Sequence, residues 1–220
     1  MNSSNSVAAL VRRVLKGEHT STDLGTLIDR LGRSESLDPL MTLLNDPKGG
    51  TVADGLYILS ELGSAGAPLT SQSARFISHP NENVRFFSIS CIAAAPNVAP
   101  SEAILKILEL QIDPSARVRW KAIDFAARVN QGALMKAAEL AETCTTNRVE
   151  HKRGIYLLLN ASPAISHEIL SSLRSTNALD RAYGAAASAR LLACGRDLIG
   201  AASTSADETI TDFARSLVGE

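Results

Sequence analysis

Apolar residues recur at spacings of three and four through most of the chain, in stretches of about ten residues separated by polar or glycine-containing turns. This spacing places the apolar side chains along one face of an α-helix. The first stretch follows Ser6 and ends at Gly17, and the second starts near Thr20 and ends at Gly32. Ser and Thr are favoured before helices and Gly after them, so residues 1–34 are predicted to form a pair of N-terminal capping helices.

The same pattern predicts paired helices along the rest of the chain. The predicted ranges are 37–44 with 52–62, 67–78 with 84–95, 101–112 with 116–129, 133–143 with 148–159, 164–174 with 179–193, and 197–203 with 207–218. Residues 46–50 are interpreted as a turn, including Gly49-Gly50, because no Lys-Ser/Thr of a phosphate loop follows them. Every connection is short, so we expect one continuous domain over residues 1–220.

A short motif recurs between the helices of a pair. The segment Asp113–Arg119 has a near copy at His79–Arg85, 34 residues upstream, and a weaker one at Asp46–Val52, another 33 residues back. Self-similarity at this period predicts a solenoid, because each helix pair can bury its apolar stripe only against its neighbours. The period continues while the motif weakens, so residues 35–130 hold the best-defined repeats and residues 131–220 the divergent ones.

This motif resembles that of the HEAT-repeat family and its bacterial HEAT-like relatives. The resemblance rests on Asp113, Pro114, Val118 and Arg119, and on Pro80, Val84 and Arg85 of the preceding repeat. It implies an all-α, right-handed α-solenoid of about six to seven stacked helix pairs. It also implies a ladder that links neighbouring repeats through Asp113 and Arg119. His79 and Val52 depart from this pattern in the upstream repeats, so the ladder would be partial.

Composition agrees with an all-α fold and narrows the function. Aromatic residues are only 4% of the chain, while Ala, Leu and Ser are abundant, which suits close-packed helices. The 22 basic and 23 acidic side chains argue against nucleic acid as a partner, because that function usually needs a basic excess.

Cysteine usage and the N-terminal sequence bear on the compartment. Cys91, Cys144 and Cys194 lie about fifty residues apart and none has a Cys or His at metal-ligand spacing, so we expect reduced thiols and no metal. The first six residues carry no basic n-region, and Arg12 and Arg13 interrupt the next apolar stretch. We therefore expect no signal peptide, no membrane span and a cytoplasmic protein.

The second helices of stacked pairs generally line the concave face of a solenoid, which is its usual binding surface. In residues 116–129 the core side is formed by Val118, Ala122, Phe125, Ala126 and Val129, and Trp120 and Asp124 lie nearly opposite. The same register turns Phe86 outward and, slightly shifted, Tyr57. A row of Tyr57, Phe86 and Trp120 is therefore a candidate hot spot for one protein partner. The alternative is that these rings pack between adjacent repeats.

The densest basic cluster comprises Arg148, His151, Lys152 and Arg153. Such a cluster is either a solvated helix surface or a patch for an acidic protein or a phosphate. His151 and Arg153 are included among the candidate partner-binding residues. The helical register is ambiguous here, because placing Val149 in the core draws Arg153 inward as well.

Few residues suggest catalysis. The four histidines are scattered, and neither a His-Glu-x-x-His nor a Gly-x-Ser-x-Gly motif is present. Trp120 and Asp124, one turn apart, are similar to the aromatic plate and carboxylate of HEAT-like alkylpurine DNA glycosylases, whose downstream arginine would correspond to Arg153 or Arg148. Alternatively, Asp124 is an exposed ion-pair partner for Lys121 or Arg128.

The sequence thus predicts a non-catalytic module that holds one protein partner on its concave face, with no catalytic residue, cofactor or metal. One version, by analogy of fold and size, is an inhibitor or immunity protein that covers the active site of a bacterial toxin or other enzyme domain. The alternatives are a general assembly scaffold, a HEAT-like enzyme acting on nucleic acid, and a chromophore lyase. The oligomeric state stays open.

Overall fold

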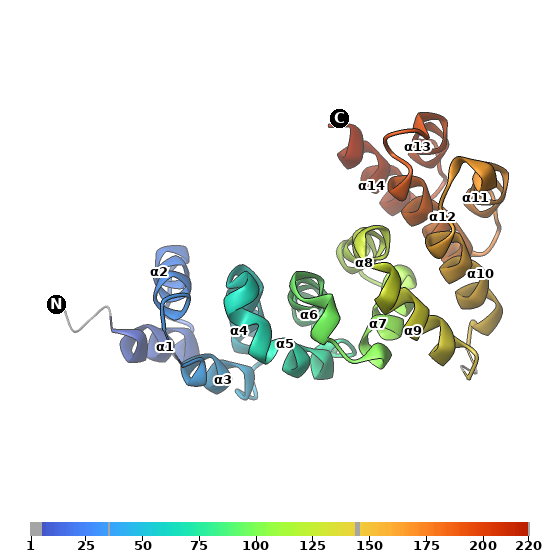
Figure 1. The fold of residues 1–220 in the computed structure, drawn as a ribbon. Helices are drawn as coiled ribbons and strands as arrows, with labels where there is room; N and C mark the ends of the chain where they lie inside the picture. Colours follow the sequence, from blue (N-terminus) through green and yellow to red (C-terminus); the bar gives the residue numbers. More distant parts are fainter. Residues whose placement is uncertain (1–5, 35, 144–145, 220) are drawn as a thin grey trace. The chain divides into compact units, whose positions relative to one another are not determined.

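The computed structural model describes residues 6–34, 36–143 and 146–219, and Cys144 lies outside them. Within these ranges the chain forms fourteen α-helices in seven consecutive pairs and no β-strand (Figure 1). This is an all-α fold of repeated helix pairs, and it confirms the predicted fold class. None of these helices combines the length and the apolar character that a membrane span requires.

The chain packs as two compact units, Met1–Ala99 and Pro100–Glu220. The boundary falls inside the range 35–130 that the motif groups together, so the single continuous domain stays a prediction. The helices of the first unit are α1 (Val7–Lys16), α2 (Ser21–Leu31), α3 (Asp38–Leu44), α4 (Gly49–Glu61), α5 (Ala67–Ser73) and α6 (Glu82–Ala94). Those of the second are α7 (Ser101–Glu109), α8 (Ala116–Arg128), α9 (Gln131–Ala141), α10 (Arg148–Leu159), α11 (Ser166–Leu173), α12 (Ala178–Arg190), α13 (Arg196–Ser203) and α14 (Glu208–Val218).

The first two helices begin and end where the sequence signals predict. The Ser6 hydroxyl accepts a hydrogen bond from the backbone N–H of Ala9, and Gly17 ends α1 with a φ of 73°. Thr20 and Asp23 form a reciprocal capping box at the start of α2. Local side chains therefore set the ends of this pair before any tertiary contact is considered.

Two predicted boundaries are wrong. Gly49 and Gly50 belong to the first turn of α4 and not to the preceding turn. A Cβ atom on Gly49 would lie 3.2 Å from Cε1 of His79. The turn that contains His79 therefore packs closely on the first turn of α4, and a small residue at position 49 suits this contact. The predicted helix 67–78 is shorter, because α5 ends at Ser73 and residues 74–76 continue as a 3₁₀ turn.

The repeated motif forms the same turn in both units. Its first residue accepts a hydrogen bond from the backbone N–H two residues later, at 2.8 Å for Asp46, 3.1 Å for His79, 2.8 Å for Asp113, 3.1 Å for Ser175 and 3.2 Å for Ser205. Asp, His and Ser all supply an acceptor here, which is why the turn persists where the sequence motif has degraded.

An arginine six positions after the start of the motif closes this turn. Nη1 of Arg119 donates to the carbonyl oxygens of Asp113 and Pro114, at 2.9 and 3.2 Å. Arg85 and Arg181 make the same two bonds in their own repeats. These contacts hold each turn together internally, whereas the resemblance implied contacts between repeats. A link from one turn to the next is present between Arg181 and Asp207, at 3.9 Å.

In the first unit the second helices pack in chain order, α2 on α4 and α4 on α6. Their apolar stripes meet those of α1 and α3 in one core, whose fully buried members include Leu10, Leu27, Leu40, Leu56 and Ile58. This arrangement is the regular stacking that the period predicts.

The second unit departs from that order. Helix α8 packs against α12 and α14, and α12 also packs against α10, α11 and α13 (Figure 1). Every residue of α12 from Leu179 to Ser188 is buried except Arg181, which is half-buried. Small side chains make this possible, since Ala occupies four of these positions and Gly184 packs against the backbone of α11. The inner faces of α8, α12 and α14 thus cover one another.

First helices also pack irregularly in this unit. Helix α7 packs beside α9, and α11 packs beside α13, but α9 and α11 make at most marginal contact. One flank of α10 is therefore left uncovered next to α11.

Candidate functional site

Trp120 and Asp124 lie within the packing of the second unit. The core register of α8 is as predicted, with Val118, Ala122 and Phe125 buried. Trp120 is half-buried, and its ring packs edge-on against Phe213 of α14 at a centroid distance of 5.9 Å.

Asp124 is 8% exposed and pairs with Arg128 at 2.6 Å and with Lys121 at 3.9 Å. The predicted ion pairs are present, but the carboxylate is not exposed as expected. It lies on the side of α8 that this unit covers, so the chain shields it from solvent.

Tyr57 and Phe86 belong to the first unit, on α4 and α6. Both are half-buried, and the structure brings them together through Phe87. The ring of Tyr57 lies 5.5 Å from that of Phe87, and the Phe86 ring meets Phe87 edge-on at 5.2 Å. The residues of the candidate row are thus divided between the two units.

His151 is fully buried and offers no surface to a partner. Its Nδ1 is hydrogen-bonded to the hydroxyl of Tyr183 at 2.8 Å, and its Nε2 has no hydrogen-bond partner among the described residues. Burial lowers the pKa of His151, and the carboxylate of Glu150 opposes that shift only in part. The physical reason is the register of α10, in which His151, Gly154, Ile155 and Leu158 face inward while Val149 is 69% exposed.

Arg153 lies on the outer side of α10. Its guanidinium forms a bidentate pair with the carboxylate of Asp180, which is 2% exposed and also accepts a hydrogen bond from the hydroxyl of Ser175 at 2.9 Å. The Arg153 side chain itself keeps 53% of its surface. Its charge thus anchors α10 to the start of α12 while one face of the guanidinium stays in solvent.

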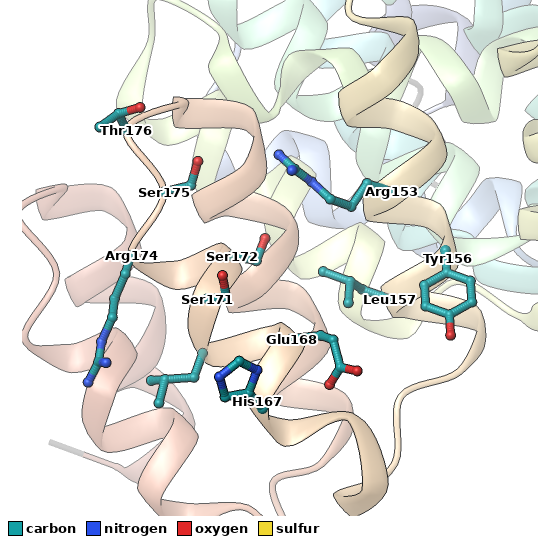
Figure 2. A pocket seen from close by; sticks show the side chains of 11 residues that line it. Arg153, Tyr156, Leu157, His167, Glu168, Ser171, Ser172, Arg174, Ser175 and Thr176 are labelled. Atoms are coloured by element: carbon teal, nitrogen blue, oxygen red, sulfur yellow. The ribbon is translucent and has the colours of Figure 1, made fainter.

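A groove of about 790 Å³ runs along this side of the second unit, and we call it the α10–α11 groove (Figure 2). Its lining residues come from the end of α10, from α11 and from the turn that follows. They are Arg153, Tyr156, Leu157, His167, Glu168, Leu170, Ser171, Ser172, Arg174, Ser175 and Thr176. Leu157 is buried and Leu170 half-buried, whereas Tyr156, His167, Glu168, Ser171 and Arg174 are exposed.

The rim of the groove near Ser175 and Thr176 is held by hydrogen bonds. Both carbonyl oxygens accept from Nη1 of Arg181, at 3.0 and 2.9 Å, and the buried hydroxyl of Ser172 donates to the carbonyl of Asp180 at 2.7 Å. A preformed surface costs a partner less conformational entropy on binding than a mobile one.

The exposed side of α10 combines large apolar side chains with charged ones. Six large hydrophobic side chains among the described residues are exposed, and two of them, Val149 and Tyr156, share this face two turns apart at 69% and 53% exposure. Lys152 and Arg148 lie beside them and both pair with Glu142, at 2.8 and 3.1 Å. Those bonds lower the pKa of the Glu142 carboxyl.

The groove holds no arrangement suited to nucleophilic or metal catalysis. Ser171 and His167 are one turn apart on α11, but no hydrogen bond joins their side chains, and Ser172 and Ser175 donate elsewhere. Within the described ranges, no three His, Cys, Asp or Glu side chains gather as metal ligands. The Cys91 thiol is buried in the first unit, which raises its pKa and keeps it protonated.

Sequence reasoning identified Arg153 but missed Tyr156, His167 and Arg174. A signal for Tyr156 was present, because Val149, Arg153 and Tyr156 share one face of the helix at spacings of four and seven. Placing Val149 in the core concealed it. His167 and Arg174 carry no local signal, since only the packing of α11 on α12 brings them beside α10.

No known protein family matches the chain, and no curated protein matches it. Solved structures that it is similar to include an engineered protein from a structural genomics consortium, with 13% sequence identity, a TM-score of 0.46, and coverage of 97% of this chain and 87% of that one. A designed armadillo repeat protein has 14% identity and a TM-score of 0.46, with coverage of 97% and 99%. At these values neither similarity bears on function, and the fold assignment rests on the helix pairs themselves.

Proposed function

We propose that this protein is a non-catalytic protein-binding module whose second unit holds its partner at the α10–α11 groove. One observation carries the proposal. Tyr156 lines this groove, whose rim is held by hydrogen bonds, and Val149 is exposed on the same helix face two turns away. Exposed apolar side chains that gather beside a hollow and are rimmed by charges are typical of protein interaction sites.

This proposal moves the contact surface away from the row of Tyr57, Phe86 and Trp120. In the second unit the inner helix faces are occupied by the contacts of α8 with α12 and α14. Arg153 stays a candidate contact, because more than half of its side-chain surface is exposed in the groove. His151 acts behind this surface by fixing how α10 packs on α12.

A specific version of the proposal is that the partner is an enzyme domain, such as a bacterial toxin, which the module inhibits. An assembly scaffold is the more general version. The two differ in outcome, because an inhibitor leaves its partner inactive in a stable complex, whereas a scaffold leaves the activity of its partner intact.

The experiment is affinity capture of the tagged protein from its native lysate, run in parallel with a Val149→Ser/Tyr156→Ala double variant. A binding module of this kind captures a stoichiometric protein that the double variant loses. The matched control is Met135→Ser, which removes a side chain of similar exposure, 54%, from α9 outside the groove. The control is expected to retain the partner.

Two results would count against the proposal. One is a partner retained equally by the double variant and the control, which would place the contact elsewhere. The other is capture of nucleic acid or a chromophore in place of a protein, which would favour the enzyme alternatives. The glycosylase-like alternative gains no support from Trp120 and Asp124, because Trp120 packs on Phe213 and Asp124 is ion-paired and buried.

A further inference from the structure

We infer that the occupant of the α10–α11 groove is a single acidic, amphipathic α-helix of the partner protein. This inference rests on the proposed function and adds the shape and the charge of the bound segment. It follows from the gap in the packing of the first helices, from the spacing of the groove residues and from the charges along the groove.

The shape follows from the interrupted stack. First helices pack side by side elsewhere in this unit, α7 with α9 and α11 with α13, but α9 and α11 do not. The uncovered flank of α10 beside α11 is therefore a position where a neighbouring helix is missing from the stack. Packed helices lie about 8–10 Å apart and cover apolar side chains such as Val149 and Tyr156, so a helix supplied by a partner suits this position.

The spacing of the side chains agrees with a helical ligand. Val149, Arg153 and Tyr156 follow one another at four and three residues along α10. His167 and Ser171 of α11 and Arg174, the residue that caps its C-terminal end, have the same spacing. Each set lies along one helix face and spans two turns, about 10 Å. Two such rows flanking a groove present ridges between which a third helix packs.

The charges favour an acidic ligand. Arg153 and Arg174 line the groove, and Arg148 and Lys152 lie on the same exposed side of α10. The carboxylates beside them are those of Glu142, Glu168 and the half-buried Glu150, and Asp180 is buried beneath Arg153. The guanidinium of Arg174 has no ion-pair or hydrogen-bond partner among the described residues. Arg148, Lys152 and Arg153 are already ion-paired, so Arg174 is the arginine available to a carboxylate.

The groove also limits what else the ligand can carry. The walls offer the hydroxyls of Ser171 and Tyr156, and the floor offers the apolar side chains of Leu157 and Leu170. A helix with aliphatic residues on one face and Glu on its flanks satisfies both surfaces at once. A basic helix would instead face Arg153 and Arg174 with like charge.

The test uses a synthetic peptide as the probe, so the natural partner is not needed. The probe is a fluorescein-labelled, stapled helical peptide of about three turns with Leu at helical spacing on one face and Glu on both flanks. Three comparison peptides have Lys in place of Glu, the same composition in a non-amphipathic order, and a proline-containing extended form. Fluorescence anisotropy measures their affinities for the full chain.

The acidic helix is expected to bind at least about tenfold more tightly than each comparison peptide, with affinity that falls as salt rises. Arg174→Glu should weaken the acidic helix at least about fivefold and strengthen the Lys helix. The matched control is Lys136→Glu, which reverses an exposed charge on α9 and is expected to change neither affinity. Circular dichroism checks that both variants remain folded.

The inference is overturned if the Lys, scrambled or extended peptide binds as well as the acidic helix, or if Arg174→Glu and Lys136→Glu behave alike. Failure of the proposed function looks different. If no peptide binds but the captured partner still depends on Val149 and Tyr156, the acidic helix is wrong and the binding surface stands. If the captured partner is also independent of those residues, both proposals fail.

Discussion

The indole of Trp120 meets the buried ring of Phe213 edge to face, with 5.9 Å between the ring centroids and 73° between their planes. These residues lie 93 positions apart in the sequence, on α8 and α14. The contact joins the first and last helix pairs of the second unit. A further bond, from Nη2 of Arg119 to the Thr209 hydroxyl at 2.7 Å, lies beside it. Trp120 therefore contributes to the packing of this unit.

Trp120→Ala is expected to destabilise the protein by about 2–4 kcal/mol, because it removes a large ring from a packed aromatic contact. Urea unfolding followed by circular dichroism measures the loss. Tyr156→Ala is the control, since its ring is 53% exposed and its removal should cost within about 0.5 kcal/mol. Unchanged stability in Trp120→Ala together with lost partner binding would restore Trp120 as an interface residue.

Gly154→Ala is expected to destabilise strongly, by more than about 3 kcal/mol, because a Cβ atom there would lie 2.1 Å from Cδ2 of Tyr183. The matched control is Gly200→Ala on α13, where a Cβ would meet nothing within 4 Å. That change should stabilise by about 0.5–1 kcal/mol, as alanine does in helix interiors. Equal effects of the two substitutions would contradict the close approach of α10 and α12.

Stability should fall as the pH drops below the ordinary histidine pKa of about 6.5. Burial lowers the pKa of His151 in the folded protein, so the unfolded chain takes up the proton first. The stabilisation is complete above pH 6.5 and is lost progressively down to the lowered pKa of the folded state. The loss is at most about 1.4 kcal/mol per pH unit.

Thermal unfolding at pH 7.5 and 5.5 measures this dependence. His151→Gln is expected to reduce the difference in Tm between the two conditions, because a neutral amide does not titrate. His167→Gln, at an exposed position, should leave the difference unchanged. A wild-type Tm difference that persists in full in His151→Gln would assign the effect to other groups.

Arg190→Met is expected to cost about 2–3 kcal/mol of stability. Its guanidinium donates to the carbonyl oxygen of Ala126 at 2.9 Å and to that of Val129 at 2.5 Å. These carbonyls end α8 and have no partner within the helix, so removing the charge leaves them unsatisfied. Methionine keeps most of the aliphatic volume. Arg196→Met, at an exposed position, is the control in the same urea unfolding experiment and should have little effect.

Helix positions were predictable because they depend on neighbours in sequence. The range 148–159 is the observed α10, and the predicted core side of α8 is its buried side. The orientation of α10 was not predictable. Its buried side contains His151 and Gly154, residue types that a hydrophobic pattern does not assign to the core. Its exposed side contains Val149 and Tyr156, which such a pattern would assign to the core. Hydrophobicity alone therefore favours the wrong face.

The sequence by itself determined the helices, their pairing and the repeated turn, since capping residues, helical periodicity and local side-chain acceptors act over a few positions. Only the tertiary structure decided that α8 packs on α12 and α14, that Trp120 and Asp124 are shielded, and that Arg153 and Tyr156 border a groove. Those outcomes depend on which small side chains allow two helices to approach. Ala-rich α12 and Gly154 permit contacts between residues far apart in the chain, and no local pattern encodes that choice.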